Sequence, residues 1–403
     1  MYHSEVLALT DDRLSLGPRL AEARERAGFS QDDVAVLLDQ PRPVVSNWEH
    51  GTRTPNSAQL TKLAAIYRVP LDELLGRAPE RPRPDFERLL FRDAGVRLDP
   101  AAKFQIQRFL SFLDAYGDLL DAMGAPPGMM ESPLFLREGF LSKDDIRRKA
   151  EEARRFFRLG DGPVGDLWSL ADLYGVTVYR APLGADLRGS VSGAFLPQDR
   201  VGFSIVVNSQ TTPGRRQFTL AHELAHALFH GDHIYVGYLG RRQSAERFAN
   251  EFAAEFLVPI QSLRSVVEAL GLVKVQDAEV VISLQRLFRV SYAMMLVRLQ
   301  AANLASRADV ERLRKVQPVH LAERLGHQIE PDEWGQDPDR WGLGRFPPRF
   351  LRLLRHALIS SKLTVGGAAS MTGLAQEDIE EFLAERPTSP EEQEEFQYLR
   401  ESA

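Results

Sequence analysis

Apolar residues recur every three or four positions over most of this chain, which predicts a mainly helical protein. Three short stretches differ, because residues 176–182, 190–197 and 202–208 are rich in β-branched and aromatic side chains and have turn residues between them. Such stretches are typical of strands. We therefore expect a mainly α protein of the α+β class, with one small antiparallel β-sheet.

Proline and glycine divide the chain into regions. Residues 76–86, 124–133 and 331–350 are rich in these two residue types, which favours linkers or breaks over packed elements. The N-terminal and central regions carry the patterns discussed below, and the last region is expected to be helical. The expected regions are 14–77, a helical linker at 78–141, a central domain at 142–305 and a helical C-terminal region at 306–403.

Composition narrows the function classes. The 403 residues include no cysteine, so any metal ion must be held by His, Asp or Glu. No apolar run approaches the ~18–20 residues of a membrane span, and the first residues lack the basic start of a signal peptide. We therefore expect a cytoplasmic protein with no membrane partner. The net charge of -6 argues against a general polyanion binder.

The N-terminal region predicts short helices joined by tight turns. One helix ends at Gly28, the next begins after Ser30, and a third ends at Gly51, which is the helix-turn-helix plan. Val45 and Trp48 have the spacing of inward-facing residues, so the rest of the third helix faces outward. Its outward residues, some of which can contact base edges, are Arg42, Pro43, Val44, Ser46 and Asn47.

Gln31 stands at the start of a helix, where its side chain can meet a phosphate. Residues 1–80 hold roughly nine Lys and Arg against twelve Asp and Glu, which disfavours strong nonspecific DNA binding. From the pattern alone, a plain helical bundle stays open as the alternative. Residues 29–76 also resemble the Xre/Cro-repressor family through the Ser-Gln start, the Trp-Glu-x-Gly segment, Pro55 and the Leu-Asp-Glu-Leu-Leu close.

This resemblance implies a five-helix, lambda-repressor-like domain that binds double-stranded operator DNA. It also implies that Gln31 and the five outward residues of the third helix face the DNA. Members of this family mostly bind as dimers, so a homodimer is expected. Pro41 and Pro43 are unusual around a recognition helix and leave its first residue uncertain.

The central region contains an HExxH motif. His222 and His226 are four residues apart, so on a helix both imidazoles can reach one metal ion. Glu223 projects to the side, where it can act as a general base. The flanking residues are apolar, which predicts a buried helix, and buried histidines beside a buried glutamate are costly unless a metal ion satisfies them. Two surface histidines on a helix are the alternative.

A third ligand is expected on the helix that follows. Glu246 and Asn250 lie one turn apart, so Glu246 can bind the metal while Asn250 holds a ligand histidine through its other nitrogen. Glu251 and Glu255 point elsewhere around that helix, and a solvated face is favoured for them. His230 is a further candidate, although a partly exposed side chain is favoured. The ligand types suit Zn²⁺, and another divalent ion stays open.

Residues from about 142 to 260 resemble the ImmA/IrrE family of metallo-endopeptidases. The resemblance rests on the FTLAHELAHALFH and ERFANEFAAEFLVP segments and on the helix and strands before them. It implies a gluzincin-like site in which His222, His226 and Glu246 bind zinc and Glu223 is the general base. It also implies cleavage of a repressor protein, in the control of mobile elements or in the response to DNA damage.

The two resemblances together predict a DNA-binding transcriptional regulator with a zinc-dependent endopeptidase domain. Two alternatives stay open: a regulator whose peptidase fold only senses a ligand, and an antitoxin-like protein in which that fold is a docking module. Residues 345–356 are basic with interleaved aromatics, and an amphipathic packing helix is favoured there over a nucleic-acid site.

Overall fold

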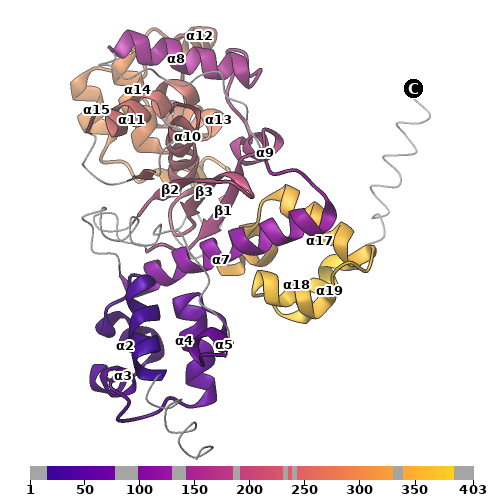
Figure 1. Ribbon diagram of the computed structural model, residues 1–403. Helices are drawn as coiled ribbons and strands as arrows, with labels where there is room; N and C mark the ends of the chain where they lie inside the picture. Colours follow the sequence, from indigo (N-terminus) through magenta and orange to yellow (C-terminus); the bar gives the residue numbers. More distant parts are fainter. Residues whose placement is uncertain are drawn as a thin grey trace, which may run out of the picture.

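The computed structural model describes residues 16–77, 99–128, 142–184, 191–229, 235–237, 243–329 and 339–384. Within these residues the protein is mainly helical and has one small sheet, which confirms the α+β class. Figure 1 shows an N-terminal lobe at the bottom, a long helix across the middle, a larger lobe with the sheet above it, and the C-terminal helices at one side.

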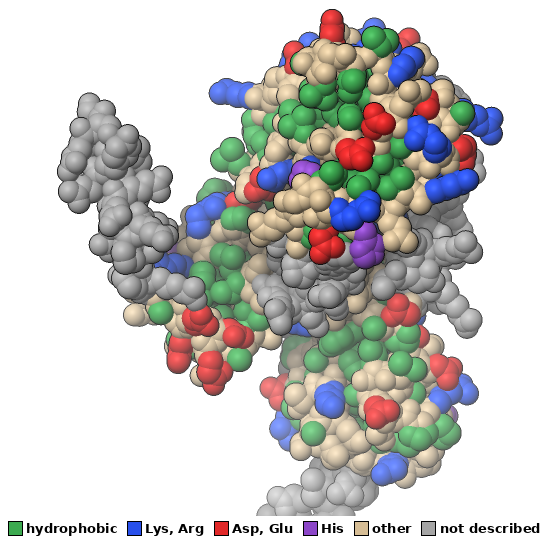
Figure 2. Space-filling model, turned by 180° about the vertical axis from the view of Figure 1, so that it is seen from behind, with side chains coloured by type: hydrophobic (Ala, Val, Ile, Leu, Met, Phe, Trp, Pro, Cys, Tyr) green, Lys and Arg blue, Asp and Glu red, His purple; other side chains and the backbone are tan. Residues whose placement is uncertain are grey.

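The N-terminal lobe contains the five expected helices. They are residues 16–26, α2 (Gln31–Leu38), α3 (Arg42–Glu49), α4 (Ser57–Tyr67) and α5 (Leu71–Leu74). Ser30 caps α2 in a capping box with Asp33, and Trp48 is only 2% exposed in the centre of the lobe. On the face shown in Figure 2, Lys and Arg lie among Asp and Glu on this lobe and form no continuous basic surface.

The sheet has the strand order β1-β3-β2-β4. β2 (Gly193–Gln198) is antiparallel to β3 (Gly202–Asn208), as expected, and also to β4 (Tyr235–Gly237), a strand that the sequence did not predict. β1 (Thr177–Ala181) instead pairs with β3 in parallel, so the expectation of a purely antiparallel sheet was wrong. The chain crosses from β1 to the far side of β3 before it turns back through the tight β2–β3 hairpin. Alternating residues predict the faces of a strand, but they do not predict which strand becomes its neighbour.

Helices cover the sheet in the upper lobe. α10 (Pro213–Phe229) packs on β2 and β3, and α11 (Gln243–Leu257) packs on α10 and on α8 (Lys143–Phe156). α9 (Leu167–Leu173) contacts α10 and β1. The same hydrophobic core extends into the next five helices. These are α12 (Ile260–Ala269), α13 (Ala278–Phe288), α14 (Tyr292–Ala301), α15 (Arg307–Leu313) and α16 (Pro318–Arg324).

No single helix among the described residues is long and apolar enough to cross a membrane. α13 and α14 reach that length and composition only together, and the chain bends by 102° between them.

α7 (Pro100–Met123) joins the two lobes. Near its start, Lys103 forms an ion pair with Asp33 at 2.7 Å, and the Gln107 amide donates to the Ala27 carbonyl at 3.1 Å. Further along, the ring of Phe112 lies 5.0 Å from that of Tyr179 on β1. The described part of the expected linker is therefore a 24-residue helix that packs on both lobes.

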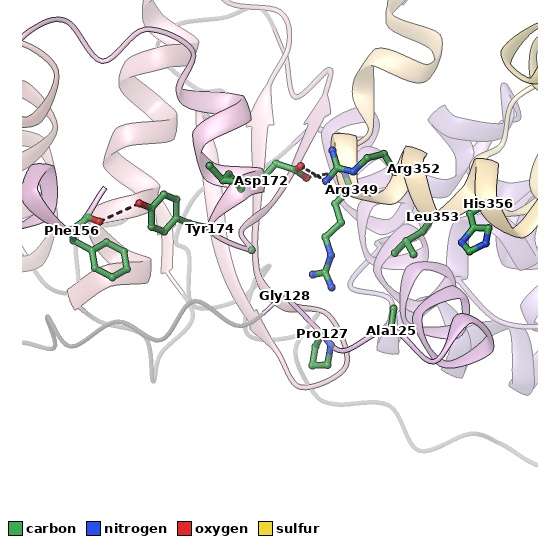
Figure 3. Close-up of a pocket in the computed structure, with 12 residues that line it drawn as sticks. Ala125, Pro127, Gly128, Phe156, Asp172, Tyr174, Arg349, Arg352, Leu353 and His356 are labelled. Atoms are coloured by element: carbon green, nitrogen blue, oxygen red, sulfur yellow. Dashed lines mark hydrogen bonds and ion pairs between the residues drawn. The ribbon is translucent and has the colours of Figure 1, made fainter. Parts of the chain in front are cut away.

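The C-terminal helices pack against α7 and the sheet. They are η2 (Asp339–Arg345), α17 (Pro348–Ile359), α18 (Val365–Thr372) and α19 (Gln376–Leu383). Asp172, just inside α9, accepts the Arg349 backbone N–H at 2.8 Å and the Arg352 guanidinium at 3.0 Å, beside a cavity of about 790 Å³ (Figure 3). Residues 348–359 thus form a packing helix whose buried residues include Phe350 and Leu354, as was favoured.

Candidate metal centre and DNA-facing helix

The HExxH helix is held on both sides. Leu220, Ala221 and Leu224 are buried in the core that α10 forms with the sheet and α11. His222 is also buried, and His226 is 0% exposed. Because residues four apart share one helix face, the two imidazoles lie next to each other and turn toward α11.

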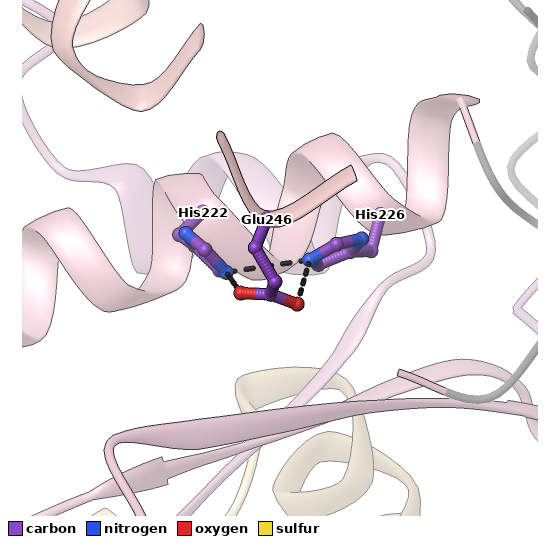
Figure 4. A group of neighbouring side chains, drawn as sticks. All are labelled: His222, His226 and Glu246. Atoms are coloured by element: carbon purple, nitrogen blue, oxygen red, sulfur yellow. Dashed lines mark hydrogen bonds and ion pairs between the residues drawn. The ribbon is translucent and has the colours of Figure 1, made fainter. Parts of the chain in front are cut away.

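Glu246 on α11 completes the group (Figure 4). Its two oxygens lie 3.3 Å from His222 Nε2 and 3.5 Å from His226 Nε2, and the two Nε2 atoms are 3.3 Å apart. Ligand atoms of the three residues all lie within 4.8 Å of one another. Among the residues that the structure describes, this is the one cluster of three or more His, Asp or Glu side chains with metal-binding spacing.

Asn250 stands where the spacing predicted it. Its Oδ1 lies 3.2 Å from His222 Nδ1. An amide oxygen only accepts hydrogen bonds, so this contact requires the proton on Nδ1, and in the neutral ring the lone pair then lies on Nε2. Three electron-pair donors then face one another, which is favourable when a cation lies between them. The residues therefore fit a zinc ion, which prefers His and carboxylate ligands.

Glu223 lies on the side of α10 that faces β2. Gly193 makes this approach possible, since a Cβ there would meet Thr219 Cγ2 at 2.7 Å. The Phe195 backbone N–H donates to the Glu223 carboxylate, while Glu223 Oε2 is buried with no hydrogen-bond partner among the described residues. Burial raises the pKa of Glu223 to about 8. The result is a buried carboxyl group with high proton affinity, adjacent to the three ligand side chains.

The charges of the ligand residues differ from those of free side chains. Burial alone would raise the pKa of Glu246, but hydrogen bonds from His222 and His226 outweigh it and lower that pKa to about 2. Burial lowers the pKa of His226. An ionised Glu246 and a neutral His226 are the forms that bind metal ions. Burial would also lower the pKa of His222, but its hydrogen bond to Glu246 and the nearby carboxylates outweigh burial and raise that pKa, so metal binding must displace a proton from this ring.

A cleft of about 1310 Å³ opens beside the cluster. α8, α10, α11 and α14 provide most of its lining, with Ser192 and Ile260 at its margins. No local pattern in the sequence indicates that α14 lines this cleft. Polar and apolar side chains both line the cleft, and its volume leaves room for a polypeptide segment next to the three ligand residues.

The other carboxylates of α11 do not join the cluster. Glu251 pairs with Arg247 at 3.0 Å on the exposed side of the helix. Glu255 was expected to be solvated, but it pairs at 2.8 Å with the buried Arg298, which also donates to the Val258 carbonyl. No local pattern indicates this partner, because Arg298 belongs to a helix and lies 43 residues further along the chain. His230 lies outside the described residues.

α3 presents the expected face to solvent. Arg42, Pro43 and Asn47 are exposed, while Val45 and Trp48 are buried. α3 begins at Arg42, with Pro41 at its N-cap and Pro43 in its first turn. Both prolines are therefore compatible with this helix, because the first turn needs no intrahelical N–H donors.

The other residues that were expected to face the DNA, Val44, Ser46 and Gln31, contact neighbouring residues of the N-terminal lobe. Val44 is half-buried against the core of the lobe, and Ser46 Oγ lies 3.3 Å from His50 Nδ1. Gln31 donates to Glu49 at 2.8 Å, so its amide links the start of α2 to the end of α3. Arg53, two residues after the glycine that ends this segment, is exposed beside α3 and was not singled out from the sequence.

Matches to known proteins agree with this geometry. Residues 20–74 match the sequence model of a helix-turn-helix domain, and residues 171–300 match that of the IrrE N-terminal-like domain. The chain thus joins an Xre-type helix-turn-helix domain to an IrrE-like domain. The first match contains α2 to α5, and the second contains His222, Glu223, His226 and Glu246.

Individual relatives match one domain each. The helix-turn-helix domain is similar to the HTH-type transcriptional regulator ImmR of Bacillus subtilis, with 42% identity over 64 residues, which are 16% of this chain and 50% of ImmR. The IrrE-like domain is similar to the radiation response metalloprotease IrrE of two species. Identity is 35% over 106 residues for Deinococcus deserti, covering 25% of this chain and 35% of that protein. It is 37% over 99 residues for Deinococcus radiodurans, covering 22% and 29%.

The chain therefore spans half or less of the length of these relatives. All of α7 and all of the C-terminal helices from η2 onward lie outside both matched segments. The sequence resemblances to the two families are confirmed at the level of these two domains.

Proposed function

We propose that this protein is a DNA-binding regulator whose IrrE-like domain is a zinc-dependent endopeptidase that cleaves a repressor protein. The observation that carries the proposal is the convergence of His222, His226 and Glu246 beside the buried Glu223. A cleft large enough for a peptide segment opens on that cluster. Because operator DNA and repressors share the cytoplasm, we also propose that the protein works there.

His222, His226 and Glu246 would hold the zinc ion, and Asn250 would orient His222 through its Nδ1 proton. With three protein ligands, a zinc site keeps a position open for water or substrate. When bound, zinc supplies Lewis acidity, which polarises a peptide carbonyl and makes water a better nucleophile.

Glu223 would carry the proton. Its Oε2 has no partner among the described residues, so this oxygen can accept a proton from the attacking water, while the Phe195 N–H holds the carboxylate in place. The same oxygen then delivers the proton to the amide nitrogen as the peptide bond breaks. Water is consumed, and a carboxylate and an amine are formed.

The DNA-binding part of the proposal rests on α3. Its exposed Arg42 and Asn47 are residue types that make bidentate contacts to bases. Arg53 adds a cation beside them that can contact a phosphate. With these few cations, we expect binding to depend on base contacts more than on a broad phosphate footprint.

The most specific part of the proposal is that the substrate is a repressor protein. It is supported by the fusion of a domain similar to that of a transcriptional regulator with one similar to that of a radiation response metalloprotease. A regulator that carries a protease can remove a second regulator bound at the same operators.

The test compares cells that express the wild-type protein with cells that express Glu223→Gln. Mass spectrometry of protein N-termini should find new termini inside a DNA-binding repressor only with the wild-type protein. Zinc content and operator binding of the variant should match those of the wild type. Equal sets of termini from both proteins would reject the endopeptidase and favour a regulator in which the IrrE-like domain senses or docks a partner.

A further inference from the structure

The cleft beside the metal centre is a trough lined mainly by faces of α8, α10, α11 and α14. On α10, Arg215, Phe218 and His222 follow one another at spacings of three and four residues, so they line one face. Glu246, Asn250 and Ala254 do the same on α11. A further face belongs to α14, and its lining residues include Met294, Val297 and Ala301.

One part of the trough is apolar. Val297 is 59% exposed although the opposite side of α14 is completely buried at Met295 and Leu299. Phe218, Ile260 and Met294 are half-buried in the same lining. Single exposed apolar residues are common, but four in one concave surface indicate a binding groove. The alanines of α11 and α14 leave space above them for a bulky side chain.

Most arginines that line the trough form ion pairs with a carboxylate. Arg298 pairs with Glu255 and Arg247 with Glu251, as described above. Arg147 pairs with Asp144 at 2.9 Å. Arg215 differs, because no carboxylate among the described residues lies within ion-pair distance of it and its nearest polar contact is Ser192 Oγ at 3.5 Å. Within the described part of the chain, the trough therefore has a half-buried cation at Arg215 that no carboxylate balances.

We propose that the trough selects protein segments that place a large aliphatic side chain against Met294 and Val297 and a carboxylate side chain opposite Arg215. This inference rests on the proposed function and adds a substrate class to it. Arg215 lies seven residues before His222, which is about 10.5 Å along the helix axis. An extended chain covers that distance in about three residues, so the acidic residue is expected about three residues from the cleaved bond.

The experiment uses the full-length, zinc-loaded protein and a library of synthetic random-sequence peptides, which contain acidic and basic residues at internal positions. Cut positions are read by mass spectrometry for the wild type, Glu223→Gln, Val297→Glu and Arg215→Glu. Val273→Glu and Arg307→Glu are matched controls, since both positions are exposed and neither lines the trough.

Wild-type cuts should be enriched in Leu, Ile, Met or Val at one position and in Asp or Glu about three residues from the bond. Val297→Glu should slow cleavage of the aliphatic peptides by about tenfold or more, within the range of hydrophobic-pocket discrimination. In Arg215→Glu, the preferred residue about three positions from the bond should change from Asp or Glu to Lys or Arg. Both controls should keep the wild-type pattern.

The outcomes separate this inference from the function on which it rests. Cuts that depend on Glu223 but show no such preference, or a preference that both trough variants retain, would overturn the substrate class alone. An absence of Glu223-dependent cuts would overturn the endopeptidase and this inference with it.

Discussion

Removal of the Asn250 side chain should weaken zinc binding without unfolding the protein. Asn250 contacts His222 Nδ1 at 3.2 Å and is otherwise exposed on α11. Asn250→Ala removes this acceptor, so the His222 ring can rotate and its proton can move to Nε2, where it blocks metal binding. His222 itself stays buried in the core of α10, so the fold should be retained.

The size of the effect follows from this contact. A hydrogen bond of this kind contributes about 0.5–1.5 kcal/mol, and loss of such an orienting partner typically costs about 10–100-fold in metal affinity. At about 1.4 kcal/mol per tenfold, that range is about 1.4–2.8 kcal/mol. The hydrogen bond alone thus accounts for the lower end, and the freed rotation of His222 must supply the remainder. Asn250→Asp keeps an acceptor and should bind zinc about as tightly as the wild type.

Zinc affinity is measured by competition with a chromophoric chelator, and circular dichroism checks the fold. Glu251→Gln is the control, because Glu251 is the next residue on α11 and pairs outward with Arg247. It should leave zinc affinity within about twofold of the wild type, since a surface ion pair is worth at most about 1 kcal/mol and does not reach the ligands. If Asn250→Ala binds zinc as tightly as Glu251→Gln, then the orienting role of Asn250 is refuted.

Three further predictions concern the rest of the molecule. Burial alone would raise the pKa of Asp33, but the hydrogen bonds from Lys103 and Ser30 outweigh burial and lower that pKa. Ionised Asp33 therefore stabilises the folded state above about pH 4, and this stabilisation is lost as the pH falls below that value. The melting temperature should therefore change less between about pH 5 and 3 in Asp33→Asn than in the wild type. An equal dependence of melting temperature on pH in both proteins would contradict this. Phe350→Ala leaves a cavity between α17 and α7 and should cost about 3–5 kcal/mol in chemical denaturation; a loss under 1 kcal/mol would show that the C-terminal helices are not part of this core. Asn47→Ala should weaken operator binding by about 1–3 kcal/mol in a fluorescence titration and leave nonspecific DNA binding unchanged; equal losses on both DNAs would refute base reading.

Local sequence patterns predicted the parts of this protein that local interactions determine. The HExxH spacing predicted that His222 and His226 share one face of a helix, and the spacing of Glu246 and Asn250 predicted the same for the next helix, because helical periodicity determines both. Ser30 and the inward spacing of Trp48 similarly predicted the capped start of α2 and the buried side of α3.

Contacts between distant segments were not predictable in this way. The parallel pairing of β1 depends on a crossover, the partner of Glu255 comes from α14, and the Phe195 N–H reaches Glu223 only because Gly193 lets β2 approach α10. Each of these depends on tertiary packing between elements whose own patterns contain no information about the partner. The packing of α7 on both lobes is of the same kind, because an amphipathic pattern does not identify what covers each face.

The central claim is that one zinc ion is held by the two histidines of α10 and the first glutamate of α11. Metal content of the purified, zinc-supplied protein, measured by mass spectrometry, tests it directly. The account predicts about one zinc per chain in the wild type and in Glu223→Gln, and loss of that zinc in His226→Ala and Glu246→Ala. A wild-type protein without zinc, or zinc that persists in both ligand variants, would contradict it.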